Sequence, residues 1–305
     1  MVQTLIDNPC FFAAEPLDRA SAERRDVDWV AARLRDPETF LLPLFEGDPL
    51  VVDGRAALLS AAALPEFGRA APTVFLGQKN GVAYFAVDAA ASGAAPEAAP
   101  FSDIGEYKGL REAAGALDEP DLSMVGQARW LLDWHARHRF CAVCGTPTEM
   151  VEGGAKRQCP NCGAEHFPRS DPVAIVLPFH GEACLLGRGP HFPPGFMSAL
   201  AGYVEAAETP EECAVRELRE EAGVTISNVR YQFSQPWPFP SSLMMGFFAD
   251  AADRNLTLDP EEIEEARWCE KSEVISILNG EGDGSVFLPP NFTIARQLLE
   301  RWVGG

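Results

Sequence analysis

One stretch, GYVEAAETPEECAVRELREEAGV at residues 202–224, constrains the fold of this chain more than any other, because it carries both the start and the stop signals of one helix. The start signals are an N-cap residue, a proline suited to the first helical position and a glutamate that completes a capping box; they are Thr209, Pro210 and Glu212. Gly223 suits the residue that follows a helix. These signals predict a helix over residues 210–222.

The predicted helix has two chemically different faces. At about 100° per residue, one face collects the apolar side chains of Val215, Leu218 and Ala222. The opposite side collects three carboxylates, those of Glu217, Glu220 and Glu221. Carboxylates at this spacing repel one another, and a hard cation such as Mg²⁺ or Mn²⁺ would remove that repulsion. The pattern alone fits both a cation site and a solvated acidic face.

The whole segment resembles the Nudix box, G-x5-E-x7-R-E-U-x-E-E-x-G-U, in which U is a bulky aliphatic residue, and it matches at every specified position. Seven fixed residues at roughly 7% each give about one chance in 10⁸ per start position. The resemblance implies an α/β fold of the Nudix type, an α/β/α sandwich with a mixed sheet. It also implies hydrolysis of a diphosphate by a metal-activated water.

The resemblance further implies a role for each residue of the box. Glu217 and Glu221 would be the main ligands of Mg²⁺ or Mn²⁺, and Glu220 a further ligand or a base. Arg216 would orient a glutamate, and Glu208 would support the box. The remaining ligands implied are the carbonyl of Ala201 and the carboxylate of Glu262.

Two small residues of the box are expected to matter through the backbone. Gly202 would allow a sharp turn. Ala207 stands where many members of the family have glycine. If that position requires a positive φ, alanine costs about 1 kcal/mol.

Four of the eight cysteines form two C-x-x-C pairs, Cys141 with Cys144 and Cys159 with Cys162. Four thiolates held on two such turns are typical of a closed structural zinc site, and a redox dithiol is the alternative. His135 and His138 lie shortly before the first pair. One of them could be a zinc ligand, but since four cysteines already complete a tetrahedron, we expect both histidines at a solvated helix end.

The segment SQPWPFPSS, residues 234–242, has three prolines within five positions, which predicts a stiff loop. Trp237 and Phe239 could stack on a base, and Gln235 and Ser242 could hydrogen-bond to it. A proline-stiffened core loop is an equally open interpretation.

The motif SQPWPFPxS, together with the upstream cysteine pairs, resembles the zinc-ribbon NADH pyrophosphatases of the Nudix superfamily. That resemblance implies hydrolysis of NADH or NAD⁺ to nicotinamide mononucleotide and AMP by a homodimer. It implies substrate contacts from Phe167, Tyr203, Gln235, Pro236, Trp237, Pro238, Phe239, Pro240, Ser241, Ser242 and Ala295. Gly154 stands where some members have a substrate-contacting glutamate, which affects substrate preference.

Three other functions compete with this one. Removal of an NAD cap from RNA breaks the same bond, but the net charge of −20 disfavours a polyanion. ADP-ribose or a nucleotide sugar could replace NADH. A nucleotide-sensing regulator would be expected to have a damaged box, and this box is intact.

The rest of the chain predicts three segments. These are an N-terminal α+β domain (1–122), a connecting helix with the zinc ribbon (123–170) and the Nudix domain (171–305). The expected strands are 173–179, 183–188, 200–204, 229–233, 243–250 and 264–269, after a hairpin at 74–77 and 82–87; the expected flanking helices are 122–139 and 292–302. The absence of a long apolar run or signal peptide favours a cytoplasmic protein without a membrane anchor.

Overall fold

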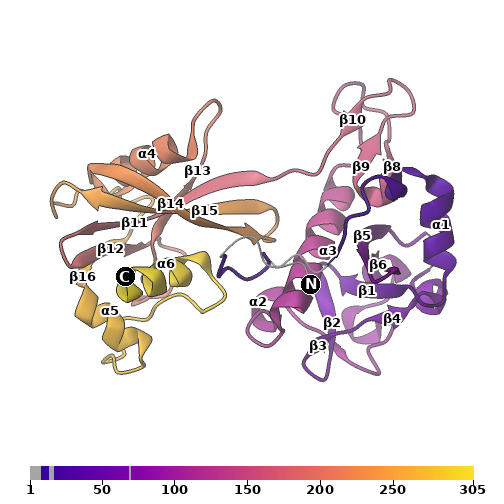
Figure 1. Ribbon diagram of the computed structural model, residues 1–305, viewed down its shortest axis with the longest axis horizontal. Coiled ribbons are helices and arrows are strands. Elements are labelled where there is room, and N and C mark those ends of the chain that lie inside the picture. The colour runs from indigo at the N-terminus through magenta and orange to yellow at the C-terminus, as the bar shows by residue number, and fades with distance from the viewer. Residues whose placement is uncertain (1–7, 14–16, 69) are drawn as a thin grey trace. The chain divides into compact units, whose positions relative to one another are not determined.

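The computed structural model describes residues 8–13, 17–68 and 70–305. The chain forms two compact units (Figure 1). We call residues 8–13, 170–237 and 242–305 the C-terminal unit, and the other described residues the N-terminal unit. The expected domain borders near residues 122 and 170 stay predictions. Within the described residues, no helix has the length and hydropathy that a membrane span requires.

The C-terminal unit is built on a six-stranded sheet with the path β14-β15-β11-β12-β16, on which β13 pairs with β11. Strand β11 runs parallel to β15 and antiparallel to β12 and β13, so the sheet is mixed, as predicted. Its elements are β11 (Asp171–His180), β12 (Ala183–Arg188), β13 (Leu200–Tyr203), α4 (Pro210–Ala222), β14 (Ile226–Trp237), β15 (Ser242–Ala251), β16 (Glu265–Glu270), α5 (Lys271–Leu278) and α6 (Ile294–Gly304).

Alternate residues of β11 face two different hydrophobic cores, because successive side chains of a strand point to opposite faces. Ala174 and Val176 pack with the buried side of α4. Ile175 and Leu177 pack with α6 on the other face. Figure 1 shows the two helices on opposite sides of the sheet, which confirms the predicted α/β/α sandwich.

Helix α4 begins and ends where the sequence predicts. The side-chain hydroxyl of Thr209 accepts from the backbone N–H of Glu212, and the Glu212 carboxylate accepts from the N–H of Thr209. Gly223 has φ 69°, in the left-handed region. The predicted apolar face is wrong at Val215, which is exposed, because the helix turns Ala214 toward the sheet instead.

The N-terminal unit holds a seven-stranded sheet with the path β3-β2-β1-β6-β5, to which β4 and β7 are attached through β1 and β2. Its hydrophobic core lies between this sheet and the short helices around it. The elements are η1 (Glu23–Arg25), α1 (Val27–Arg35), β1 (Phe40–Phe45), β2 (Asp48–Val52), β3 (Arg55–Ala56), β4 (Leu59–Ser60), η2 (Ala61–Phe67), β5 (Thr73–Lys79), β6 (Val82–Asp88), η3 (Ala89–Ser92), η4 (Pro96–Ala98), β7 (Glu106–Tyr107), α2 (Leu110–Ala113) and α3 (Glu119–Arg137).

The predicted hairpin is formed by β5 and β6, and Asn80 and Gly81 at its turn both have positive φ. A separate three-stranded sheet follows α3. It consists of β8 (Glu149–Val151), β9 (Lys156–Gln158) and β10 (Glu165–His166), with η5 (Glu152–Gly154) between the first two strands.

Candidate active site

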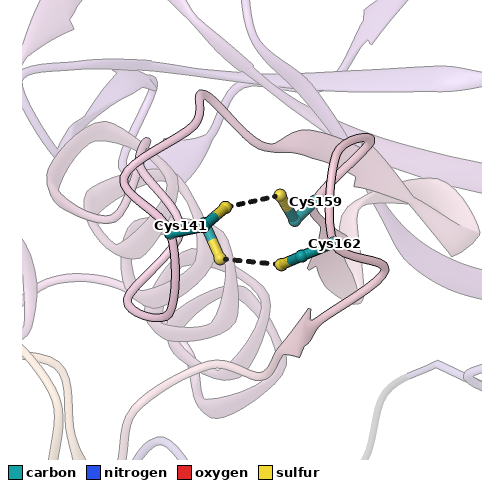
Figure 2. Close-up of side chains that lie close together, drawn as sticks. Cys141, Cys159 and Cys162 are labelled. Atoms are coloured by element: carbon teal, nitrogen blue, oxygen red, sulfur yellow. Dashed lines mark hydrogen bonds between the residues drawn. The ribbon is translucent and has the colours of Figure 1, made fainter.

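The four paired cysteines meet at one point of the small sheet. Their sulfur atoms all lie within 4.8 Å of one another (Figure 2). Both knuckles have the same turn: Gly145 N–H donates to the Cys141 carbonyl and Gly163 N–H to the Cys159 carbonyl, each at 2.9 Å. Four converging thiols on matched turns fit a structural zinc ion, whose preferred ligands are thiolates in a tetrahedron.

Of the two histidines before the ribbon, one is exposed as predicted and the other is buried. His138 is exposed, as expected, but His135 is buried, so a solvated helix end is wrong for it. Its Nε2 lies 2.8 Å from the Gly154 carbonyl, and its Nδ1 lies 3.1 Å from the Arg157 guanidinium. Burial lowers the pKa of His135 to about 4, because the charged ring would lose hydration.

Another histidine, which sequence reasoning missed, contacts the ribbon cysteines. The Nε2 atom of His166 lies 3.3 Å from the sulfur of Cys141. Gly154 stands where the resemblance places a substrate-contacting glutamate in some members of the family. In this chain the backbone conformation and the neighbouring side chains favour glycine at that position. Gly154 has φ +90°, and a Cβ there would lie 2.6 Å from a methyl group of Val74.

The expected catalytic residues converge on helix α4 and strand β13. Arg216 forms a two-pronged ion pair with Glu208, with Nε to Oε1 at 2.7 Å and Nη2 to Oε2 at 2.9 Å. Its Nη1 donates to Glu217 at 2.8 Å and to Glu220 at 3.2 Å. Arg216 therefore fixes one carboxylate of the helix relative to the loop before it. The same ion pair lowers the pKa of Glu208 to about 2.

Glu221 differs from the other glutamates because it is buried, and its Oε2 atom has no hydrogen-bond partner in the described structure. Burial raises its pKa to about 8, and repulsion from Glu217 and Glu262 adds to that shift. A solvated acidic face is therefore excluded for Glu221. An unpartnered buried carboxylate facing other carboxylates fits a divalent cation, since such ions take oxygen ligands.

The residues around Glu221 complete the donor set. Glu262 is exposed and lies on the turn whose Asp259 N–H donates to the Glu221 carbonyl at 3.0 Å. Ala201 is an exposed residue of β13. Gly202 also lies in β13, opposite Ala174, so the predicted sharp turn is wrong. Glycine at this position leaves room for Glu217, because a Cβ there would lie 1.9 Å from the Glu217 carboxylate and would displace it.

The segment SQPWPFPSS is half strand, so a loop throughout is wrong. Residues 234–237 end β14 and pair with the start of β15, with Trp237 opposite Ser242. Strand β14 is an edge strand, which tolerates Pro236 because one side of an edge strand has no partner to receive an N–H. The connecting turn is formed by residues 238–241, which belong to the N-terminal unit.

The expected substrate residues lie in different environments. Tyr203 in the C-terminal unit and Phe167 in the N-terminal unit are exposed. Ala295 lies in α6 and is buried against the core that this helix covers. Gln235 is fully buried, and its amide bonds to the carbonyls of Phe11 and Phe292 and to a backbone N–H of α6.

Comparisons with known proteins agree with this architecture. Residues 168–289 match the NUDIX domain, 136–167 the NADH pyrophosphatase zinc ribbon domain, and 38–134 the NADH pyrophosphatase-like rudimentary NUDIX domain. The N-terminal match identifies a domain for which the sequence predicted only an α+β layout, because residues 1–122 carry no motif of their own.

Three relatives are similar over long stretches. The NAD-capped RNA hydrolase NUDT12 of Homo sapiens is 34% identical over 96% of this chain and 73% of its own length. The NAD-capped RNA hydrolase NudC of Mycobacterium bovis (strain ATCC BAA-935 / AF2122/97) is 36% identical over 94% of each chain. The NudC of Stutzerimonas stutzeri (strain A1501) is 42% identical over 65% of this chain and 67% of its own.

The sandwich, the intact box and the carboxylates on its helix define a Nudix hydrolase. With the cysteine ribbon and these relatives, the chain belongs to the zinc-ribbon NADH pyrophosphatase family of that superfamily.

Ala207→Gly should stabilise the protein. Ala207 has φ 65°, the left-handed conformation that alanine adopts at a cost. Relief of that cost, less the larger unfolded-state entropy of glycine, leaves a gain of about 0.5–1 kcal/mol. Denaturant unfolding measures it, with Ala206→Gly as the matched control, which should destabilise. A loss of stability in Ala207→Gly would contradict the prediction.

Glu221→Gln should stabilise the protein at high pH when no Mg²⁺ or Mn²⁺ is present. The pKa of Glu221 is about 8 in the folded protein and about 4.5 in the unfolded chain. The proton on Glu221 therefore contributes its full stability to the folded state below pH 4.5, and this contribution is lost as the pH rises through 8. At pH 9 the wild type therefore carries a buried charge that the variant lacks. Thermal unfolding should show a gain of at least about 2 °C at pH 9 and little change at pH 5.

The exposed neighbour provides the control for this pH experiment. Glu220→Gln removes a charge from the same helix without removing a buried one. It should show a smaller gain at pH 9 than Glu221→Gln. Equal shifts in the two variants would mean that burial of Glu221 does not govern the stability of this helix.

Proposed function

We propose that this protein hydrolyses the diphosphate of NADH and NAD⁺, adding one water to give nicotinamide mononucleotide and AMP. The observation that carries the proposal is the buried, unpartnered carboxylate of Glu221 within an intact box. A stable fold has no need of a charge placed there, whereas a diphosphate hydrolase needs cation ligands beside its substrate. The ribbon and the SQPWPFPSS segment support a dinucleotide as that substrate.

We assign the cation site to Glu217, Glu220, Glu221, Glu262 and the carbonyl of Ala201. Mg²⁺ or Mn²⁺ bound there would neutralise diphosphate charge and lower the pKa of a water. The chain contributes the positions of its carboxylates. Arg216 holds Glu217 at the strand where Gly202 leaves room for it, and Glu208 holds Arg216 in turn. This arrangement requires no nucleophilic side chain.

We further propose that Tyr203 and residues 234–237 and 242 of the C-terminal unit contact the substrate, and, as a separate proposal from the resemblance, that Phe167 and residues 238–241 do so. Exposed rings such as Tyr203 and Phe167 can stack on a base, since every base has an aromatic face. Gln235 acts indirectly, because its amide is used within the protein. Ala295 is buried, so any contact from its position would involve neighbouring atoms. We expect a homodimer in the cytoplasm.

NAD-capped RNA is a second candidate substrate, because the similar proteins of Homo sapiens and Mycobacterium bovis are named NAD-capped RNA hydrolases. The same bond would be cleaved, so the catalytic carboxylates would act in the same way. The net charge of −20 weighs against tight binding of the RNA chain itself.

A hydrolysis assay with Mg²⁺ or Mn²⁺ on NADH, NAD⁺, ADP-ribose and NAD-capped RNA tests the proposal, with products separated by chromatography. We expect AMP and the mononucleotide from NADH at the highest kcat/KM. A higher value for ADP-ribose would contradict the substrate, and cleavage of none of them would contradict the activity.

In the same assay, Glu221→Gln should lower kcat by several orders of magnitude while the protein stays folded, because a cation ligand is lost and the shape is kept. Circular dichroism and thermal unfolding check the fold. A rate near that of the wild type would overturn the assignment of Glu221.

A further inference from the structure

Residues 8–13, which we call the N-terminal strap, belong to the C-terminal unit although the chain then continues into the other unit. We infer that the strap is a positioning element of the substrate site: it holds the end of β14 and sets the orientation of Trp237. This inference rests on the proposed function, because it assumes that Trp237 lies against a base of the substrate.

The strap is bonded to two successive residues of β14. The side-chain amide of Asn8 donates to the carbonyl of Ser234 at 2.8 Å. The side-chain amide of Gln235 donates to the carbonyl of Phe11 at 3.1 Å. Both contacts lie just before Trp237 on an edge strand, where the sheet supports the chain from one side only.

Gln235 connects the strap to a third segment. Its Nε2 also donates to the Phe292 carbonyl at 2.7 Å, and its Oε1 accepts from the Ile294 N–H at 2.7 Å, at the start of α6. The buried side-chain amide of Gln235 thus joins the strap, strand β14 and the beginning of helix α6. Loss of the strap would leave part of this amide without its partner, which is costly in a buried place.

Phe12 gives the strap its contact with the indole. Its ring meets that of Trp237 edge-on, with centroids 6.4 Å apart and planes at 88°. The ring of Phe292 lies nearly parallel to the indole, at 6.2 Å and 15°. One ring edge-on to the indole and one nearly parallel to it restrict both the tilt and the rotation of Trp237.

The backbone of Phe12 shows that this contact is held against strain. Phe12 has φ 66°, a conformation that is rare for a bulky residue, and only 4% of its surface is exposed. Such a conformation persists where the surroundings determine it, and it often accompanies a functional site. Here it places the ring on Trp237.

The strap should affect substrate binding more than the chemical step. Arg216 holds carboxylates of α4, whereas the strap contacts residues 234, 235 and 237 of β14. Phe12→Ala should therefore raise KM for NADH roughly three- to tenfold, as expected for loss of one aromatic pair. The value of kcat should stay within about twofold.

The matched control is Phe11→Ala, which removes a neighbouring ring but keeps the carbonyl that Gln235 uses. It should leave KM unchanged within about twofold. If Phe12→Ala does not fold, Phe12→Gly removes the same ring and tolerates the positive φ. Either Phe12 variant should also speed hydrogen exchange at residues 234–237, where Phe11→Ala should not.

The outcomes separate this inference from the proposed function. If the wild type hydrolyses NADH and the Phe12 variants have an unchanged KM, the inference about the strap is wrong and the proposed function stands. The same conclusion follows if Phe11→Ala raises KM as much as the Phe12 variants do. If the wild type does not cleave NADH, the proposed function fails. In that case hydrogen exchange still tests whether the strap holds β14. Equal exchange at residues 234–237 in the wild type and the Phe12 variants would overturn this inference as well.

Discussion

The candidate site depends on one electrostatic constraint, the burial of the Glu221 carboxylate among other carboxylates. Without a cation, burial and repulsion raise its pKa to about 8, so the folded protein favours a proton there. A bound divalent cation would supply the positive charge that the surrounding residues do not. The charge of Arg216 offsets only part of the rise in pKa, since its donors bond to Glu208, Glu217 and Glu220. The fit of this site to a cation therefore follows from the packing of α4.

That packing was largely predictable, because its causes are local. The capping box, the proline and the C-terminal glycine placed α4 correctly, and continuous apolar runs placed the central strands β11 and β12. The cysteine spacing predicted the thiol cluster, since two short turns bring four thiols together. In these segments, neighbouring residues in the sequence determine the structure.

Errors arose where partners are distant in the sequence. Three prolines predicted a loop at 234–242, but pairing with β15 extends the strand through Pro236. His135 looked solvated, and the Gly154 carbonyl that it contacts lies in a different element. The bonds of Gln235 to residues 11, 292 and 294 could likewise not be predicted, and its contact with substrate stays a prediction. The spacing of residue types along the sequence does not indicate contacts between such distant residues.

The two metals proposed for this chain have different roles. Four thiols close the ribbon site, so an ion there stabilises the small sheet. The carboxylates of α4 lie partly at the surface, and Glu220 and Glu262 are exposed, so this second site is open to a substrate. The donor atoms of the two sites thus fit the different roles proposed for them, thiols for structural zinc and carboxylates for a catalytic cation.

The most direct test of this account is a Mn²⁺ titration followed by electron paramagnetic resonance, comparing wild type with Glu221→Gln. Zinc content is measured in the same samples. We expect the variant to lose at least one bound Mn²⁺, or to bind it at least about tenfold more weakly, while its zinc content is unchanged. Equal stoichiometry and affinity in the two proteins would contradict the claim that Glu221 is a cation ligand.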